Sequence, residues 1–181
     1  MRTFAMSLII AAALAAAPAL ALTPPLPAPV IPGYGMFGEI PDAFEIPDPK
    51  LEYKLLFDVS AAPADPATAH QGLRRVALLL NILGRYGVRP AAGNIAVIVH
   101  GKPDTLVLTQ EAHMKRHGKP NPNFELIKML SEAGVSIRLC GQSGLARGYA
   151  TEEINPLVKV DPAAIITIAT LQSKGYGLVQ D

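Results

Sequence analysis

The stretch NPNFELIKMLSEAGVSIRLCGQS, residues 121–143, carries the pattern that decides the fold. Asn121 followed by a proline predicts the start of a helix, because an N-cap side chain and a proline in the first turn both favour one. Apolar residues then recur at helical spacing until Gly134, and the run 135–140 predicts a strand. A helix that leads directly into a strand indicates a repeating α/β architecture.

The same alternation extends on both sides of this stretch. Short apolar or β-branched runs between turn residues predict four further strands, at 53–60, 94–101, 157–160 and 176–179. Two more helices are expected, one from Asp65-Pro66 to Gly87 and one from Asp161-Pro162 to about Lys174. The sequence therefore predicts an α/β domain: a three-layer sandwich with a mostly parallel five-stranded sheet.

Residues 1–21 have the three-part plan of a secretory signal peptide. Arg2 gives a positive start, a small apolar run follows, and Ala19 and Ala21 supply the small residues at the cleavage positions. The run is short and rich in alanine, which argues against an uncleaved membrane anchor. We therefore expect a periplasmic protein that begins at Leu22 and has no membrane span after the signal is removed.

The composition of the mature chain argues against two classes of partner. Loss of Arg2 with the leader leaves fifteen basic and fifteen acidic residues, so the net charge is zero. A neutral chain gives no electrostatic argument for binding nucleic acid or an anionic membrane. A single cysteine cannot form an internal disulfide, so packing alone must hold the fold.

Residues 22–50 form a proline-rich arm that precedes the α/β domain of residues 51–181. Eight prolines occur in the arm, and this density blocks both helices and sheet ladders. We expect an extended segment that is a tether, or that lies across the domain or across a neighbouring subunit. Four large apolar residues in its second half favour a packed arm, namely Phe37, Ile40, Phe44 and Ile46.

Cys140 is the first candidate for chemistry, because it is predicted at the carboxyl end of a strand. Ligands of open parallel sheets bind beyond these ends. Gly141, Gln142 and Ser143 follow in a glycine-rich turn whose N–H groups can stabilise a thiolate. The thiolate is the nucleophilic form of cysteine, and it attacks sulfane or disulfide sulfur.

The surroundings of the cysteine leave three interpretations open. Arg138 and Arg147 lie close in sequence, so positive charge near the sulfur would favour the reactive thiolate. Cys140 could instead be a packed structural residue, since a free cysteine behaves as a small hydrophobe. A third possibility is an intermolecular disulfide, which an oxidising compartment permits.

His100 is the second candidate, at the end of the predicted strand 94–101. Gly101 allows a sharp exit of the chain from this strand. If the two strands are neighbours, His100 could accept a proton from the thiol of Cys140 or orient a ligand. The alternative is a histidine whose hydrogen bonds are satisfied locally at the strand end.

The segment HMKRH, residues 113–117, places two histidines four positions apart. This is a metal-ligand spacing on a helix, but no third ligand follows at a motif distance. We therefore predict no metal and no other cofactor, and interpret the segment as a basic lid whose Lys115 and Arg116 attract anions. Asn121 and Asn123 are either caps or ligand-binding residues.

Several of these segments together resemble the DsrE/DsrF-like family. RRVALLLNILGRYGV (74–88), NIAVIVHG (94–101), the stretch 121–143 and TLQSKGYGLV (170–179) carry the resemblance, in order, over roughly residues 51–181. The branch it resembles most is the exported one, with a single cysteine in a CGQS context. The resemblance implies a five-stranded α/β sandwich, assembly into trimers or hexamers, and a strand-end cysteine that carries sulfur as a persulfide.

Two functional hypotheses follow from the residues and the resemblance. In the first, the protein binds or relays sulfur through a Cys140 persulfide, with His100 assisting and a small sulfur-containing ligand or a sulfur-relay protein as partner. In the second, it is an oligomeric module that binds a small molecule or a partner without catalysis, and Cys140 is structural. The residues expected to bind the ligand are Gly101, Gly141, Gln142, Ser143, Asn121 and Asn123.

Overall fold

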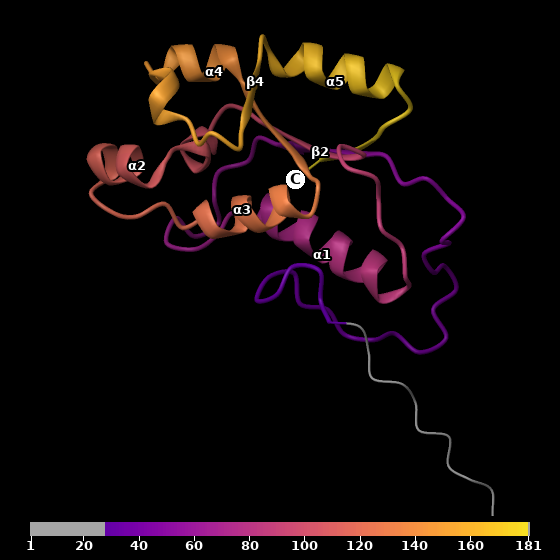
Figure 1. Cartoon of the computed structure of the whole chain (residues 1–181). Helices are drawn as coiled ribbons and strands as arrows, with labels where there is room; N and C mark the ends of the chain where they lie inside the picture. Colours follow the sequence, from indigo (N-terminus) through magenta and orange to yellow (C-terminus); the bar gives the residue numbers. More distant parts are fainter. Residues whose placement is uncertain (1–27, 181) are drawn as a thin grey trace, which may run out of the picture.

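The structure is a computed structural model that describes residues 28–180 (Figure 1). The predicted signal peptide, residues 1–21, lies outside the described residues. Within residues 28–180, none of the helices has the length and apolar character that crossing a membrane requires.

Five parallel strands form a single sheet in the order β4-β3-β2-β1-β5. Their bounds agree with the predicted runs to within a few residues, and the sheet is parallel throughout. The strands are β1 (Leu55–Val59), β2 (Ile95–Val99), β3 (Ser136–Cys140), β4 (Lys159–Asp161) and β5 (Gly177–Gln180). β2 and β3 are neighbours, and Val99 pairs with Leu139 at their carboxyl ends.

Helices cover both faces of the sheet, as the predicted three-layer sandwich requires. Helices α1 (Gln71–Arg85) and α3 (Phe124–Glu132) lie on one face, and α4 (Gly141–Ala146) and α5 (Ala164–Ser173) lie on the other (Figure 1). The connection from β2 to α3 contains the 3-10 helix η1 (Asp104–Val107) and helix α2 (Gln110–His117), and η2 (Thr151–Glu153) precedes β4.

The core is divided unequally between the two faces. The larger cluster lies under α1 and α3, where side chains such as Leu73, Leu80 and Ile127 are almost completely buried. The smaller cluster lies under α5 and contains Leu56, Ala96, Ile98, Cys140, Ala164 and Leu171. Burying one large aliphatic side chain stabilises a fold by roughly 1.5–3 kcal/mol, so the α1/α3 face provides most of the packing energy.

All three helix starts predicted from Asx-Pro pairs are wrong by a few residues. α1 begins at Gln71, where the His70 ring nitrogen Nδ1 accepts a hydrogen bond from the Gly72 N–H at 3.1 Å. α3 begins at Phe124 and α5 at Ala164. Two of the Asx-Pro pairs form turns instead: Asp65 Oδ1 accepts from the Ala67 N–H at 2.8 Å and Asn121 Oδ1 from the Asn123 N–H at 2.9 Å. Asp161 is the last residue of β4. Proline disfavours helical geometry in the residue that precedes it, and a turn gives the side chain of that residue a local hydrogen bond.

The proline-rich arm is held against α1 by one buried amide, that of Asn81. Its Oδ1 accepts from the Ile31 N–H at 2.7 Å, and its Nδ2 donates to the carbonyls of Ile31, Tyr34 and Gly35 at 3.1, 2.8 and 3.2 Å. Gly35 passes so close to α1 that a Cβ there would lie 2.2 Å from the Leu78 nitrogen. Ile31 itself is 1% exposed. The arm therefore packs through residues 31–35.

The apolar residues in the second half of the arm favoured a packed segment, but the structure does not bury them against the domain. An ion pair between Arg85 Nη2 and Glu39 Oε1, at 2.7 Å, connects this half of the arm to α1. The four large apolar residues of this half are classed as exposed, and Phe44 is fully exposed. They are Phe37, Ile40, Phe44 and Ile46. A role for them across a neighbouring subunit stays a prediction.

Candidate functional site

Cys140 is the last residue of β3 and the N-cap residue of α4. Its side chain belongs to the small cluster under α5, beside Ile98 and Ala164. Gly141 follows because the chain passes close to the end of β4 here: a Cβ on it would lie 2.8 Å from the Asp161 carbonyl oxygen. The predicted glycine-rich turn is thus the start of a short helix.

Peptide dipoles from two helix starts converge on the sulfur. Burial alone raises the pKa of the Cys140 thiol, but hydrogen bonds from the backbone N–H groups of Ser143, Ala164 and Gln142 and from the Ser143 hydroxyl outweigh it. The pKa is therefore lowered. Ala164 is the first residue of α5, and the N-cap residue of that helix, Ala163, makes no side-chain cap hydrogen bond. Cys140 makes no side-chain cap hydrogen bond to α4 either, so the pKa of the thiol reflects nearby N–H dipoles and not a formed cap.

The two arginines expected to help the thiolate form ion pairs with other residues. Arg138 Nη1 lies 3.1 Å from Asp161 Oδ2, and Arg147 Nε lies 3.0 Å from Asp104 Oδ2. Both charges are matched by a carboxylate. The lowered pKa of Cys140 therefore comes from N–H and O–H dipoles and not from arginine charge.

Cys140 is more enclosed than a freely accessible thiol. The residue is 6% exposed and counts among the buried hydrophobic residues. The isolated chain therefore does not present an open, accessible sulfur.

His100 and Gly101 complete the carboxyl-end cluster. Gly101 has a φ of 73°, and its N–H donates to Ser143 Oγ at 3.1 Å. The Ser143 hydroxyl thus contacts the Gly101 backbone and also lowers the pKa of the Cys140 thiol. The structure brings together Cys140, Gln142, Ser143 and Gly101, and His100 directly precedes Gly101 in the chain.

The imidazole of His100 pairs with a carboxylate that the sequence analysis missed. His100 Nε2 lies 2.7 Å from Asp58 Oδ1, on the neighbouring strand β1. The ring is therefore directed towards Asp58, and the second ring nitrogen is the one left for a ligand or proton. The signal for Asp58 was its position as the one polar residue in the run LLFDV of a buried strand.

Gln142, Asn121 and Asn123 have structural partners. Gln142 Nε2 donates to the Pro162 carbonyl at 3.3 Å, which joins α4 to the start of α5. Asn121 Nδ2 donates to the carbonyls of Leu106 and Leu108, both at 2.8 Å. Asn123 Oδ1 accepts from the His70 N–H at 2.7 Å. The two asparagines join three loops, and these bonds do not involve the residues around Cys140.

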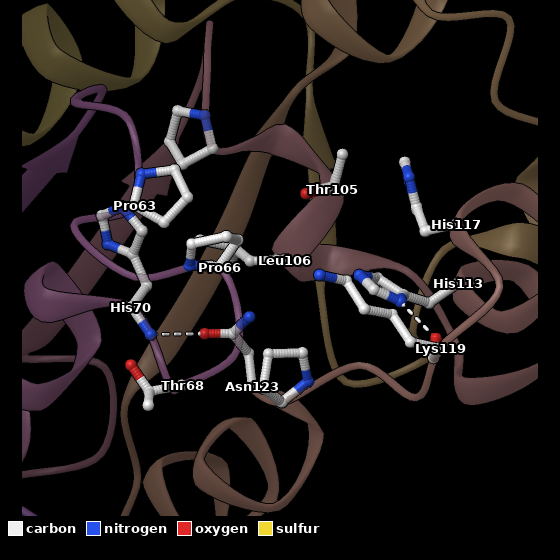
Figure 2. A pocket seen from close by; sticks show the side chains of 12 residues that line it. Pro63, Pro66, Thr68, His70, Thr105, Leu106, His113, His117, Lys119 and Asn123 are labelled. Carbon is white, nitrogen blue, oxygen red and sulfur yellow. Dashed lines mark hydrogen bonds between the residues drawn. The ribbon is translucent and has the colours of Figure 1, made fainter.

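The segment 113–117 is helical, but its histidines border a cavity that shares no lining residue with the cluster around Cys140, so its role as a basic lid stays a prediction. It forms the last turns of α2, and the ring centroids of His113 and His117 are 4.7 Å apart. His113 is buried, and both rings line a cavity with Lys119 and Asn123 (Figure 2). Within residues 28–180, no group of three or more histidine, cysteine or acidic side chains is placed to hold a metal.

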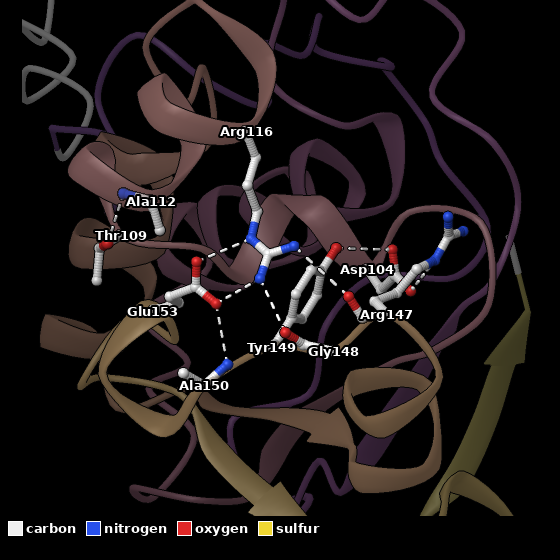
Figure 3. Close-up of polar contacts among 9 residues, drawn as sticks. All are labelled: Asp104, Thr109, Ala112, Arg116, Arg147, Gly148, Tyr149, Ala150 and Glu153. Carbon is white, nitrogen blue, oxygen red and sulfur yellow. Dashed lines mark hydrogen bonds and ion pairs between the residues drawn. The ribbon is translucent and has the colours of Figure 1, made fainter.

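Arg116 of the segment 113–117 binds a carboxylate and not a ligand. Its Nε donates to Glu153 Oε1 at 2.8 Å, its Nη2 donates to the Gly148 carbonyl at 2.9 Å, and its guanidinium lies 4.9 Å from the ring centre of Tyr149 (Figure 3). The hydrogen bond from Arg116 lowers the pKa of Glu153 to about 2. Behind this network, Asp104 is 1% exposed, and its burial raises its pKa. These contacts fix α2 to the segment between α4 and η2.

Several solved structures are similar to this chain, and two of them illustrate the likeness. The protein of unknown function MTH1491 from Methanobacterium thermoautotrophicum superposes with a TM-score of 0.52 at 17% sequence identity, over 72% of this chain and 100% of that one. The ychN protein from E. coli gives a TM-score of 0.51 at 16% identity, over 71% and 99% of the two chains. At such identities the likeness concerns the fold alone. A comparison with curated proteins found no match.

A comparison with protein-family models identifies the domain more specifically. The model of the DsrE/DsrF-like family matches residues 54–180, a range that contains all five strands and the Cys140 turn. The resemblance noted in the sequence is thereby confirmed at the level of the family, while the exported branch stays a prediction. This protein belongs to the DsrE/DsrF-like family.

Proposed function

We propose that the protein binds sulfur at Cys140 as a persulfide and passes it on. One observation carries this proposal: the pKa of the Cys140 thiol is lowered although the residue is buried. The groups that lower it are the N–H groups of Ser143, Ala164 and Gln142 and the Ser143 hydroxyl, at the starts of α4 and α5. These donors stabilise negative charge at the position where a thiolate or a persulfide anion would carry it.

The proposed reaction is thiol–disulfide exchange with a polysulfide donor. The Cys140 thiolate attacks a sulfane sulfur, an Sγ–S bond forms, and the S–S bond of the donor breaks. The departing sulfur keeps the electron pair of the broken bond and takes a proton. His100, oriented by its 2.7 Å contact with Asp58, is the group in this cluster that can exchange that proton. A thiol acceptor reverses the step and removes the sulfur.

Mass spectrometry tests this proposal directly. Reduced mature protein incubated with polysulfide should gain about 32 Da for each sulfur added, and a reductant should remove it. Cys140→Ser should gain nothing, whereas His100→Gln should gain sulfur more slowly. A wild-type protein that takes up no sulfur, and resists alkylation until it is denatured, would contradict the proposal.

The second candidate function is a binding module in which Cys140 only packs. The 6% exposure of the residue favours it, because buried free cysteines behave as small hydrophobes. In that case Cys140→Ala should keep both the fold and the binding function. The same polysulfide experiment separates the two functions, since a packed thiol does not take up sulfur.

We also propose that copies of the chain associate through the α4/β4/α5 face. Leu145, Ile165 and Ile166 are 74, 73 and 54% exposed there. Apolar residues lie on every side of α5 without a separate polar face, a pattern typical of a helix that is covered on more than one side. A groove of about 520 Å³ runs along this face beside α4 and the start of α5. A second copy that covered it would also shelter the sulfur, and trimers or hexamers are the expected assemblies.

The location of the protein is part of the same proposal. A cleavable signal over residues 1–21 would deliver it to the periplasm, where a lone cysteine must be used or sheltered to escape oxidation. Intact-mass measurement of the exported protein should give a chain that begins at Leu22. A mass that retains residues 1–21 would contradict export by this route.

A further inference from the structure

A second cavity lies away from Cys140, between the loop before α1, the loop after β2, the end of α2 and the start of α3. Its volume is about 220 Å³. Four prolines and Leu106 make its walls apolar, and none of its lining residues is acidic. It shares no lining residue with the cluster of Cys140, His100, Gly101 and Ser143. It is therefore a separate site.

Three basic side chains of the cavity lie together on one side, away from Thr68 and His70. His113, His117 and Lys119 lie together at that side, with Thr105 nearby (Figure 2). His113 is 6% exposed, and its Nδ1 lies 2.8 Å from the Lys119 carbonyl oxygen. A carbonyl oxygen can only accept, so Nδ1 is the protonated nitrogen. Nε2 of this buried ring is then left for a ligand in the cavity.

The frame of the cavity is fixed before any ligand arrives. Asn123 Oδ1 holds the His70 N–H at 2.7 Å, which attaches the loop before α1 to the start of α3. Asn121 Oδ1 accepts from the Asn123 N–H at 2.9 Å, and Asn121 Nδ2 fixes the loop after β2 through the Leu106 carbonyl. Prolines in the walls restrict the loops further. A site of this kind loses little entropy when it binds.

The charge around the cavity favours an anion. Lys119 is the one lining residue with a permanent charge. Burial lowers the pKa of His117, and the charges of His113, Arg116 and Lys119 lower it further, while Asp104 acts in the opposite direction. Of these four ionisable groups that act on the ring, Asp104 is the acidic one. An anion placed among them would relieve the repulsion.

We propose that this cavity binds a small organic anion, a carboxylate or sulfonate with a compact apolar body, and that His113 takes up a proton when the anion binds. The head group accepts from the Lys119 ammonium and from the newly protonated Nε2 of His113, and the body packs against the prolines and Leu106. A water molecule occupies roughly 30 Å³ of liquid, so about seven waters fill the same space. The ligand therefore has fewer than about ten heavy atoms.

Calorimetry on the mature protein tests the site with three probes: isobutyrate, methanesulfonate and neutral isobutyramide. The two anions should bind, and the amide should bind at least tenfold more weakly. Affinity should fall as pH rises, by up to tenfold for each pH unit, because a proton is taken up with the anion. Titrations in buffers with different ionisation enthalpies should show about one proton bound per anion.

Two matched variants locate the binding. Lys119→Met removes the ammonium but keeps the carbonyl that orients His113, and it should weaken anion binding at least tenfold. Lys115→Met removes a similar charge from α2 that does not line the cavity, and it should change affinity less than twofold. His113→Gln should abolish the proton uptake.

Three results would overturn the proposal. The first is equal binding of the neutral amide and the anions. The second is binding that Lys119→Met leaves unchanged. The third is the absence of heat from either anion up to about 10 mM at pH 6, a concentration that reveals even Kd values near 1 mM. Cys140→Ser should bind the anions like the wild type, so the outcome does not depend on the sulfur chemistry.

Discussion

At the scale of single residues, the thiol of Cys140 is controlled by neutral dipoles. The sequence predicted its place at a strand end and the N–H groups of the following turn. It did not predict Ala164, because that contact depends on how α5 meets β3 in space. It also gave the arginines the wrong role, since Asp104 and Asp161 are distant in sequence from Arg147 and Arg138.

The first prediction concerns the ionisation of Cys140. The rate of alkylation should rise with pH around a midpoint below the ordinary thiol value of about 8.5. Ser143→Ala removes the hydroxyl that helps to lower the pKa of the thiol and should move the midpoint upward. Ser173→Ala on α5 is the control and should leave the midpoint unchanged.

The same lowered pKa of Cys140 gives stability a pH dependence of known sign. A depressed pKa means that the folded state loses its proton first, so the stabilisation appears as pH rises through the folded value and is complete above the unfolded one. Cys140→Ser should remove this increase between neutral and alkaline pH. A denaturation midpoint whose pH dependence matches that of the variant would contradict the assignment.

At the scale of elements, hydrophobic periodicity predicted every strand and the ends of α1 and α3. Gly87 and Gly134 take φ values of 76° and 87° just beyond those helices, as a helix end requires. Helix starts were less predictable, because an Asx-Pro pair serves equally well as a turn before the helix. The hydrogen bonds between the Asn81 amide and the arm were not predictable, since a polar residue in a helical pattern does not reveal its partner.

The second prediction tests the hydrogen bonds between the Asn81 amide and the arm. Asn81→Ala leaves the buried Ile31 N–H without its acceptor and should cost about 1–3 kcal/mol of unfolding free energy. Limited proteolysis should then cut the arm well before the domain. Arg85→Ala is the matched control, because its exposed ion pair with Glu39 contributes less than about 1 kcal/mol. Equal effects of the two variants would argue against a special role for the buried amide.

The third prediction concerns the contact of α2 with the segment before β4. Carbon NMR of the side chain should show Glu153 titrating at a pKa of about 2. Its contribution to stability is complete above the unfolded value of 4.5 and is lost as pH falls from there towards 2. Arg116→Ala should return the titration towards 4.5. Glu152→Gln, a change at the neighbouring carboxylate, should leave the Glu153 titration in place.

At the scale of the whole molecule, the two faces of the sheet differ in how much apolar surface their helices leave exposed. The α1/α3 face is thickly packed, whereas the α4/β4/α5 face presents Leu145, Ile165 and Ile166 to solvent. The sequence predicted the layers but not this asymmetry, because a run of apolar residues does not tell which neighbour covers it. A net charge of zero in the mature chain does not oppose association.

The fourth prediction concerns assembly. Sedimentation of the mature protein at micromolar concentration should give a trimer or a hexamer. Ile165→Glu places a charge on the open face of α5 and should yield smaller species. Leu51→Glu changes an equally apolar residue that is 59% exposed outside that face, and it should leave the assembly intact. A wild-type protein that sediments as a monomer would refute the proposed interface.

The position of β5 has a consequence for the time at which the chain can fold. β1 lies inside the sheet, bordered on one side by β2 and on the other by β5, and Leu55 pairs with Gly177 from the opposite end of the domain. During synthesis, the β1 edge stays unpaired until residues 177–180 have left the ribosome. The sheet is therefore completed only after translation of the domain. Throughout elongation, the nascent chain exposes the unpaired edge of β1.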